Sequence, residues 1–373
     1  MTADVIVCGL GAMGSSAAYH LAAGGARVLG FDRFAPPHTL GSSHGKTRII
    51  REAYFEDPLY VPLIQRAYEC WDLLERASGH ALLTRTGGLM IGSPMSAVVS
   101  GAQASAVRHR LEHERLADGA LKARTPAFTF DAGTVAIWEP RAGVLQPEAA
   151  IDTQLTLARK LGAELHANEP VLSWSANADG VEVTTAQGRY SAGHLVIAVG
   201  AWATQLLGEL SLPLRVERTV AYWFDALEPA LFTAERFPIF IHEFAPGRSW
   251  YGFPDLGDGV KVALHHQGVT VEPESVNRIV GDDEIAFVRS LLERYLPAAN
   301  GSLRETAVCM YTNTPDDHFI LDRHPVSERV IVASPCSGHG FKFSSVIGEI
   351  IAEMATGRPH AFDLAPFRLS RFQ

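Results

Sequence analysis

A glycine-rich turn near the start of the chain restricts the possible folds more than any other feature of the sequence. Gly9, Gly11 and Gly14 match the pattern G-x-G-x-x-G. A β-branched run at residues 4–8 precedes the turn, and good helix-forming residues at 15–23 follow it. This order of strand, turn and helix is typical of the unit that binds a dinucleotide, because the glycines let the backbone approach a pyrophosphate at the helix N-terminus.

The segment that follows the helix completes the same unit. Residues 27–31 are predicted to form a second strand, and Asp32 ends it 18 residues after the last glycine of the turn. A carboxylate at this point can accept hydrogen bonds from the ribose hydroxyl groups of a dinucleotide. The motif therefore predicts a Rossmann-type βαβ unit, although by itself it does not separate FAD from NAD.

Segments with strand-like and helical patterns continue along the rest of the chain. At 373 residues the chain exceeds the size at which one hydrophobic core usually stops growing, so two domains are expected. Apolar spacing predicts amphipathic helices at 60–78 and 147–161, each followed by glycine. Strands are predicted at 163–166, 181–185, 195–199 and 329–333, helices from Trp202 and at 344–354, and two alternating strands at 250–254 and 260–265 joined by a turn at 255–259.

Charge and cysteine content exclude several classes of function. The formal net charge is -9, which argues against a nucleic-acid partner. The sequence contains no run of about 20 apolar residues, the length that a membrane-spanning helix needs. The four cysteines, Cys8, Cys70, Cys309 and Cys336, have neither disulfide-framework nor zinc-site spacing. The first residues lack a basic region and a cleavage site, so we expect a cytoplasmic protein that acts on small molecules.

A long polar block after the βαβ unit is more specific than the glycine motif. Residues 36–51 read PPHTLGSSHGKTRIIR, and they resemble the block P-P-H-x-x-G-S-x-H-G-x-T-R-x-I-R of the monomeric sarcosine oxidase and N-methyltryptophan oxidase family. Further matches are YGFP at 251–254, CMYT at 309–312 and SGHGFKFS at 337–344. The resemblance covers essentially the whole chain, and the ending from 362 to 373 is most similar to the N-methyltryptophan members.

The resemblance implies an α/β (α+β overall) fold with a discontinuous Rossmann-type FAD-binding domain. That domain would comprise residues 1–80, 145–215 and 320–373. An inserted, mainly antiparallel substrate domain would comprise residues 81–144 and 216–319. The resemblance also implies that this protein is a monomer and contains FAD. The FAD would be joined covalently to Cys309 through a thioether at the flavin 8-methyl group.

The resemblance also assigns roles to individual residues. The implied cofactor contacts are Gly9, Gly11, Gly14, Asp32, Ser42, Thr47, Arg48, Val171, Cys309, Gly338, Gly340 and Lys342. Arg51 and Lys342 would bind the substrate carboxylate, with Tyr311 beside the substrate. Lys261, His265, Tyr251 and Arg48 would be the catalytic side chains, with Lys261 promoting the reaction with O2.

Local patterns are compatible with these roles but do not require them. In a helical turn Arg48 and Arg51 would share one face. In strands, Lys261 would share a face with His265, and Cys309 with Tyr311. The ordinary alternative is that such arginines, lysines and histidines are exposed and that a lone cysteine is a small buried hydrophobe, which is the interpretation we give to Cys8, Cys70 and Cys336.

The predicted activity is oxidation of a secondary, N-methyl amino acid to an imine, with O2 reduced to hydrogen peroxide. Three alternatives remain open at this point. The chain could be a flavin dehydrogenase that uses another electron acceptor, an oxidase of a cyclic amino acid such as pipecolate or proline, or a dinucleotide-binding protein that uses NAD or has no catalysis. Sequence does not determine the width of the substrate pocket.

Overall fold

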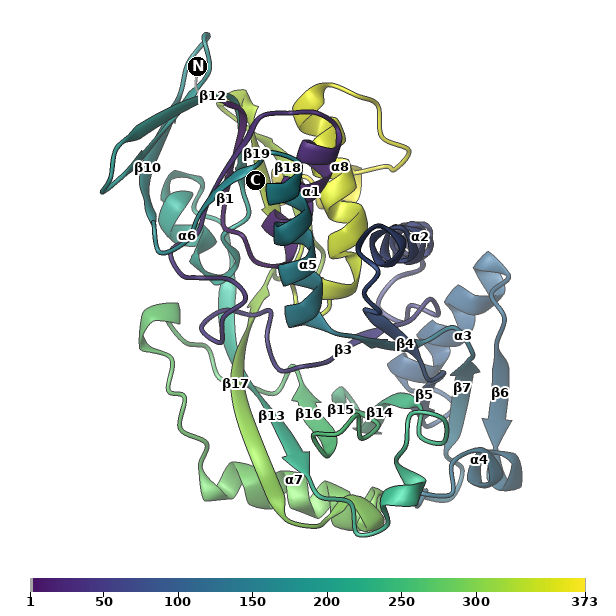
Figure 1. Cartoon of the computed structure of the whole chain (residues 1–373). Helices are drawn as coiled ribbons and strands as arrows, with labels where there is room; N and C mark the ends of the chain where they lie inside the picture. The colour runs from purple at the N-terminus through teal and green to yellow at the C-terminus, as the bar shows by residue number, and fades with distance from the viewer. Residues whose placement is uncertain (1–2, 373) are drawn as a thin grey trace.

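Three β-sheets and eight α-helices make up the part of the chain, residues 3–372, that the computed structural model describes (Figure 1). In the first sheet, β1 lies between β2 and β12, and all three run parallel. β9 and β19 extend the parallel part, whereas β10, β11 and β18 are antiparallel. The strands are β1 (Ala3–Cys8), β2 (Val28–Phe31), β9 (Glu164–His166), β10 (Val171–Ala176), β11 (Val181–Thr185), β12 (Arg189–Ile197), β18 (Ile320–His324) and β19 (Ser327–Ser334).

The second sheet is built from the middle of the chain, with its strands in the order β17, β13, β16, β15, β14, β5, β7, β6. Every neighbouring pair is antiparallel except β14 and β5, as expected for a mainly antiparallel sheet. Its strands are β5 (Gly88–Gly92), β6 (Glu114–Ala117), β7 (Val135–Glu139), β13 (Arg215–Phe224), β14 (Ile239–Ala245), β15 (Arg248–Phe253), β16 (Val260–His265) and β17 (Leu303–Asn313).

A small third sheet lies between the two large ones (Figure 1). It joins β3 (Arg48–Ile50), β8 (Gly143–Leu145) and β4 (Leu83–Arg85), all antiparallel. The prediction that Arg48 and Arg51 share a face of a helical turn is therefore wrong. Arg48 pairs with Leu145 instead, and a strand that finds its partner that far along the chain gives no local signal.

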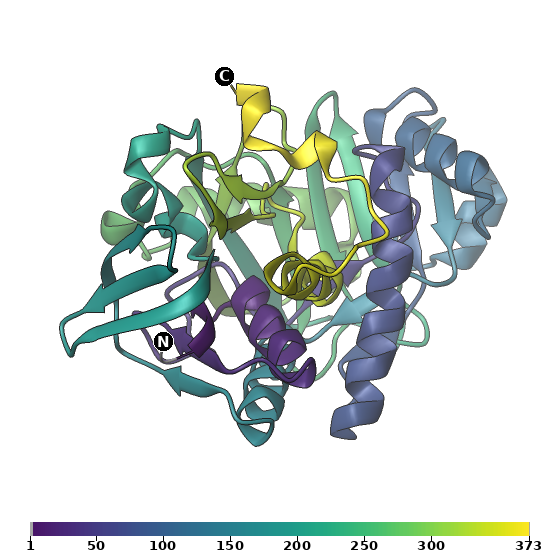
Figure 2. The ribbon, with the colours of Figure 1, turned by 90° about the horizontal axis from the view of Figure 1, so that it is seen from above.

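The helices cover the sheets. They are α1 (Ala12–Ala23), α2 (Val61–Ser78), α3 (Ala97–His109), α4 (Asp118–Arg124), α5 (Pro147–Lys160), α6 (Ala203–Leu206), α7 (Asp282–Tyr295) and α8 (Ser344–Thr356). α1 packs against both α5 and α8, and α8 also contacts α2 (Figure 2). The helix expected from Trp202 is a single turn, α6, and the predicted helices at 60–78, 147–161 and 344–354 are confirmed within two residues.

The sequence pattern of α2 explains why it forms and where it ends. Val61, Ile64, Tyr68 and Trp71 repeat every three or four residues, and all are fully buried. Gly79 ends the helix at φ +73°, a conformation that costs glycine little. The Trp71 indole Nε1 donates a 2.9 Å hydrogen bond to the Lys342 carbonyl, so α2 also fixes the turn before α8.

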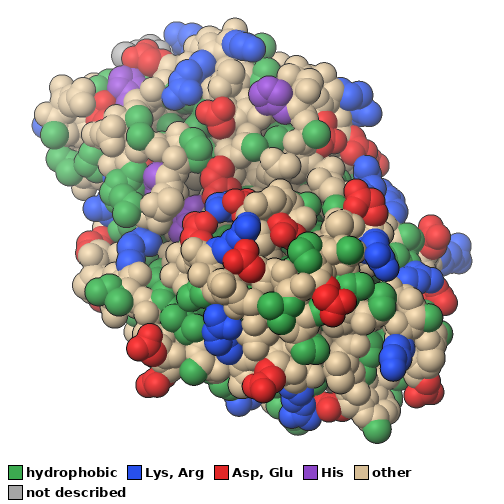
Figure 3. Space-filling view, turned by 60° about the horizontal axis from the view of Figure 1, so that its bottom comes forward, with side chains coloured by type: hydrophobic (Ala, Val, Ile, Leu, Met, Phe, Trp, Pro, Cys, Tyr) green, Lys and Arg blue, Asp and Glu red, His purple; other side chains and the backbone are tan. Residues whose placement is uncertain are grey.

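Acidic and basic side chains are interspersed on the face shown in Figure 3. Among the described residues, no helix is long and apolar enough to span a bilayer. The four cysteines are free, and three of them, Cys8, Cys70 and Cys309, are buried.

Candidate active site

A cavity of about 530 Å³ lies where the carboxyl end of β1 meets β16 and β17. Its volume falls within the roughly 300–1,000 Å³ that is usual for small-molecule and cofactor sites. Two residues predicted for the site, Gly14 and Thr47, are not among the residues that line it. The predicted residues that line it are Gly9, Gly11, Asp32, Ser42, Arg48, Arg51, Val171, Tyr251, Lys261, His265, Cys309, Tyr311, Gly338, Gly340 and Lys342.

The glycine-rich turn forms one end of the cavity. A Cβ atom at Gly11 would meet only Ser43 Oγ, 3.9 Å away, so the backbone there is open to a ligand. At Gly14 a Cβ atom would lie 1.7 Å from the Gly9 carbonyl oxygen, so this glycine allows α1 to pack against the turn. The α1 N-terminus has no capping side chain and no acidic residue in its first turn. Its N–H groups and dipole therefore suit a pyrophosphate.

Asp32 and its neighbours form the adjoining wall. The Asp32 carboxylate accepts hydrogen bonds from Leu10 N at 2.7 Å and Phe34 N at 2.8 Å, and burial raises its pKa. The guanidinium of Arg33 lies 4.9 Å from the Trp202 ring centroid, and Trp202 Nε1 is buried without a hydrogen-bond partner in the described part of the chain. The adenosine half of FAD fits this wall. The Asp32 carboxylate has free lone pairs, the Arg33 guanidinium is a flat cationic surface and Trp202 Nε1 is an unpaired donor.

Arg48 and Cys309 lie together in the middle of the cavity. Arg48 donates hydrogen bonds to the carbonyl oxygens of Ser42 and Thr47, both at 2.8 Å, and its Nη2 lies 3.6 Å from Cys309 Sγ. The Cys309 thiol is 3.3 Å from the same Ser42 carbonyl. The sulfur thus faces the cavity beside the guanidinium group of Arg48.

Lys261 is held by a turn from the other half of the molecule. Its Nζ donates hydrogen bonds to Gly45 O at 2.6 Å, Thr47 O at 2.9 Å and Thr47 Oγ1 at 3.0 Å. Three acceptors match the three N–H bonds of an ammonium group, although burial, and then the charge of Arg48, lower the pKa of Lys261. The Glu148 carboxylate fixes this turn by accepting from Gly45 N and Lys46 N at 2.7 and 3.0 Å.

A buried ion pair occupies the predicted carboxylate site at Arg51. Arg51 is 1% exposed, and its Nη2 donates to both carboxylate oxygens of Glu56, at 2.6 and 2.5 Å. Burial opposes ionisation of Glu56, but the charges of Arg51 and Lys342 lower the pKa of its carboxyl. The fork that is expected to bind a substrate carboxylate already binds one from the protein.

Lys342 supplies the second cation at this end of the cavity. It precedes α8 and is buried, with its Nζ donating to His339 O at 2.6 Å and to Tyr54 Oη at 3.3 Å. Burial, and then the charge of Arg51, lower the pKa of Lys342 to about 7. This lysine can therefore change its charge near neutral pH.

Two tyrosines and a histidine form the remaining wall. The hydroxyl groups of Tyr251 and Tyr311 are 3.2 Å apart, and burial raises the pKa of both. The His265 ring centroid lies 6.1 Å from that of Tyr251 and 5.8 Å from that of Tyr311. Burial, and then neighbouring His266, lower the pKa of His265 well below its usual range, so the imidazole is neutral.

Sequence reasoning missed four residues that shape the site: Tyr54, Glu56, Glu148 and His339. Glu56 and Glu148 are ordinary acidic residues until the fold places them against Arg51 and the Gly45 turn. His339 lies within the SGHGFKFS motif and Tyr54 lies three residues after the block at 36–51, but their contact with each other is tertiary, since they are 285 residues apart. The one sequence signal for the ion pair at Arg51 is a carboxylate, Glu56, five residues further along the chain.

Comparison with known proteins agrees with this geometry. The protein-family model for FAD dependent oxidoreductases matches residues 4–354. The chain is 46% identical to monomeric sarcosine oxidase of Streptomyces avermitilis, covering 95% of this chain and 94% of that protein. It is 38% identical to N-methyl-L-tryptophan oxidase of Salmonella heidelberg, with both chains fully covered. The structure of glycine oxidase from Geobacillus kaustophilus superposes with a TM-score of 0.84 at 19% identity, over 99% of this chain and 98% of that one, which supports the fold.

Proposed function

The chain belongs to the FAD-dependent oxidoreductase family, and on that premise we propose that it is an oxidase of N-methyl amino acids. It oxidises the C–N bond of a secondary amine to an imine and reduces O2 to hydrogen peroxide. Water then hydrolyses the imine, releasing formaldehyde and the primary amino acid when the oxidised carbon is an N-methyl group. The names of the two relatives support this assignment.

One observation carries the proposal. Two buried cations, Arg51 and Lys342, line the same cavity as the dinucleotide turn at Gly9 and Gly11. A cavity that combines a dinucleotide end with a pair of carboxylate ligands suits oxidation of an amino acid, because the carboxylate anchors orient the C–N bond. Binding is an exchange in which the substrate carboxylate replaces that of Glu56 in the fork of Arg51.

The cofactor in this proposal is FAD, which supplies the hydride acceptor when bound. The residues that would hold it are Gly9, Gly11, Asp32, Val171, Ser42, Arg48, Gly338 and Gly340, with Cys309 as the point of covalent attachment. Gly14 and Thr47 support the site from behind, through α1 and Lys261 respectively.

The charges of the site favour the form of the substrate that reacts. Hydride loss from carbon requires a neutral amine, whereas a free amino acid carries an ammonium group. Arg48, Arg51 and Lys342 line the cavity with positive charge and lower the affinity for that ammonium proton. The substrate amine then faces the hydroxyls of Tyr251 and Tyr311, which hydrogen-bond to it, and the neutral imidazole of His265, which accepts its proton.

Lys261 serves the second half-reaction. Its ammonium group is fixed over the Trp223 and Phe253 rings, 5.2 and 4.7 Å from their centroids, and needs no rearrangement to stabilise negative charge when oxygen is reduced.

Residues 1–80, 145–215 and 320–373 would form the FAD-binding domain, and residues 81–144 and 216–319 the substrate domain. Four free cysteines fit a reducing compartment, so we place the enzyme in the cytoplasm, as a monomer.

A visible spectrum and a peroxide assay test the proposed function. Purified protein is expected to be yellow and to release hydrogen peroxide with at least one of sarcosine, N-methyltryptophan, pipecolate and proline. Anaerobic bleaching by substrate without peroxide in air would identify a dehydrogenase, and a colourless preparation that binds NAD would overturn the assignment. The ranking of the four substrates measures the width of the pocket.

Arg51→Ala is expected to lower kcat/KM by about two orders of magnitude, because a charge-assisted hydrogen bond to a buried carboxylate contributes roughly 2–3 kcal/mol. Lys342→Ala should have a similar effect, and the double variant should lose less than the sum of the two. Exposed Arg85, which pairs with Asp72, provides the control, since Arg85→Ala should leave kcat/KM unchanged. Steady-state kinetics with the best substrate would exclude Arg51 from the site if its removal had no effect.

Glu56→Gln tests whether Glu56 competes with a bound carboxylate for the guanidinium of Arg51. Loss of the competing charge should tighten binding of a carboxylate that has no amine, such as propionate, as measured by its perturbation of the flavin spectrum. Weaker binding would mean that Glu56 organises the fork and does not compete for it.

Burial, and then the charge of Arg51, lower the pKa of Lys342 to about 7. Propionate binding is therefore expected to weaken as the pH rises through that value. The ammonium form binds the anion and is present below that pKa, so Kd should be nearly constant below pH 6 and about tenfold higher near pH 8. Lys342→Arg keeps its charge throughout and should flatten the profile. An unchanged slope in that variant would assign the titration to another group.

A further inference from the structure

A chain of buried hydrogen bonds runs outward from Lys342 to the backbone. Lys342 Nζ lies 3.3 Å from Tyr54 Oη, Tyr54 Oη lies 2.6 Å from His339 Nδ1, and His339 Nε2 lies 3.0 Å from the carbonyl oxygen of Asp317. Tyr54 is 0%, His339 5% and Lys342 5% exposed. Solvent therefore does not complete these bonds, and each group depends on the next for its polar partner.

The direction of every bond in this chain follows from its outer end. A carbonyl oxygen can only accept, so His339 Nε2 carries a proton and donates it to Asp317. Burial lowers the pKa of His339 to about 3, so the ring is neutral and Nδ1 is an acceptor. The Tyr54 hydroxyl must then donate to His339, which leaves its oxygen to accept from Lys342.

This direction determines what Lys342 can do. An ammonium group has three N–H bonds, of which one is used by Tyr54 Oη and one by the carbonyl oxygen of His339. One N–H bond remains for the cavity that Lys342 lines. Since both fixed partners are acceptors, they stabilise the charged form against the burial and the neighbouring Arg51 that disfavour it.

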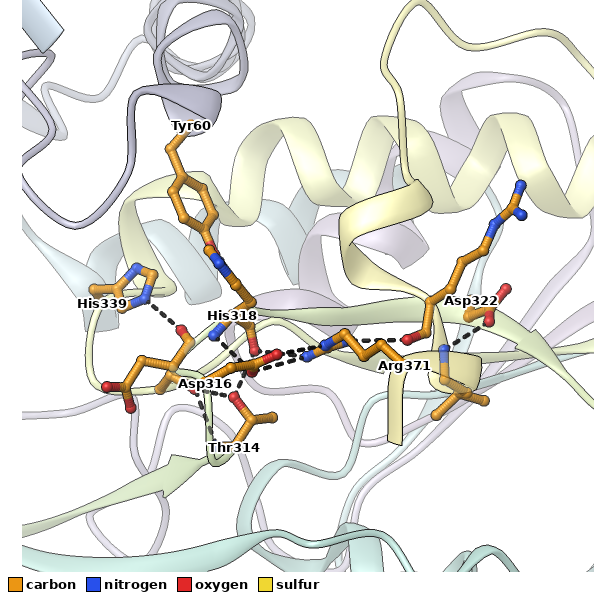
Figure 4. A network of polar contacts seen from close by, with 11 residues as sticks. Tyr60, Thr314, Asp316, His318, Asp322, His339 and Arg371 are labelled. Atoms are coloured by element: carbon orange, nitrogen blue, oxygen red, sulfur yellow. Dashed lines mark hydrogen bonds and ion pairs between the residues drawn. The ribbon is translucent and has the colours of Figure 1, made fainter. Parts of the chain in front are cut away.

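The loop that carries Asp317, at the outer end of this series of hydrogen bonds, is itself fixed. Asp317 lies in a loop between Thr314 and His318, where Thr314 Oγ1 donates to His318 O at 2.7 Å and Asp316 accepts from Arg371 at 2.8 Å (Figure 4). The Arg371 guanidinium also donates to the His318 carbonyl at 3.1 Å. The segment near the end of the described chain thus holds the loop whose carbonyl orients His339.

We propose that Tyr54 and His339 are positioning residues that hold Lys342 as an ammonium group with one N–H bond aimed into the cavity. The proposal rests on the proposed function, in which Lys342 binds the substrate carboxylate. Neither Tyr54 nor His339 needs to touch the reacting atoms, because each acts through the hydrogen bond that it makes to its neighbour.

Tyr60 offers a matched control. It is also 0% exposed, its ring lies 5.0 Å from that of Tyr54, and its hydroxyl bonds a histidine, His318 Nδ1, at 3.0 Å. No hydrogen bond links Tyr60 to Lys342 among the described residues. Tyr54→Phe and Tyr60→Phe therefore remove equally buried hydroxyls from the same aromatic cluster, but only one of them reaches the lysine.

The experiment compares wild-type holoenzyme with Tyr54→Phe, Tyr60→Phe and Lys342→Met, measuring propionate Kd at pH 6 and pH 8, substrate kcat and KM, and Tm. The groups that face Lys342 and could also titrate or shift its charge are Glu56, Arg51, Arg48, Tyr54 and His339. Tyr54→Phe is expected to raise Kd and KM by roughly fivefold at pH 8, less at pH 6, with kcat within twofold of wild type. Tyr60→Phe should match wild type in Kd at both pH values, whatever its Tm.

The outcomes separate the positioning role from the proposed function. Wild-type affinity in Tyr54→Phe, or an equal loss in Tyr60→Phe, overturns the positioning role if Lys342→Met still weakens propionate binding. Wild-type propionate affinity in Lys342→Met overturns the assignment of Lys342 as a carboxylate ligand in the proposed function, and the positioning role with it. Parallel losses of kcat and Tm in Tyr54→Phe without a change in Kd also overturn the proposal, since they indicate a structural role.

Discussion

Lys261→Met is expected to slow the reaction of the reduced enzyme with oxygen by about two or more orders of magnitude, corresponding to roughly 3 kcal/mol of lost charge stabilisation. Methionine keeps the length of the side chain and removes the charge that Gly45 and Thr47 hold in place. Anaerobic reduction by substrate should fall only modestly, because hydride loss from a neutral amine gains little from this cation. Stopped-flow absorbance measures the two half-reactions separately.

Lys46 provides the control for this variant. Its Nζ lies 5.4 Å from the centroid of the same Trp223 ring, but it is partly exposed and pairs with Asp258 and Glu305. Lys46→Met should leave both half-reactions close to wild type. Equal loss in both half-reactions of Lys261→Met would indicate a general defect of β16, and unchanged reoxidation would transfer the role to another cation, with Arg48 the next candidate.

Wild-type protein is expected to keep its flavin through acid precipitation and denaturing electrophoresis, whereas Cys309→Ser should release all of it. The effect is all or none, because serine has no thiolate to form the thioether. In-gel fluorescence and the absorbance of the acid supernatant measure bound and free flavin.

Cys336→Ser tests whether any cysteine in the cavity would do. Cys336 also lines the cavity, but its Sγ accepts from Ser334 Oγ at 3.8 Å, whereas the Sγ of Cys309 lies beside Arg48. Cys336→Ser should retain flavin as wild type does. Complete release of FAD from denatured wild-type protein would refute the covalent bond while leaving the rest of the site intact.

The elements with local signals could be predicted from the sequence, and those that depend on distant partners could not. The turn at Gly9 and the stripe of α2 follow from residue types within one or two turns of chain, and both are confirmed. The strand β3 was missed because its pairing with β8 is set by tertiary contact.

The candidate site divides in the same way. The resemblance named the cations Arg48, Arg51, Lys261 and Lys342, and all four line one cavity. It could not indicate that Arg51 is already paired, because an ion pair between side chains depends on rotamers that no motif encodes. The support that Glu148 gives to the Gly45 turn was equally invisible, since it joins α5 to a loop about a hundred residues earlier.

That support from Glu148 has a consequence for how the enzyme can evolve. Lys261, the proposed oxygen-activating lysine, is fixed through a loop that α5 holds, whereas the proposed carboxylate ligands Arg51 and Lys342 come from the segment after β3 and the turn before α8. Lys261 itself lies on β16, apart in sequence from both of those segments. We therefore expect substitutions at Lys261 to change the reactivity with oxygen while the proposed carboxylate ligands stay in place.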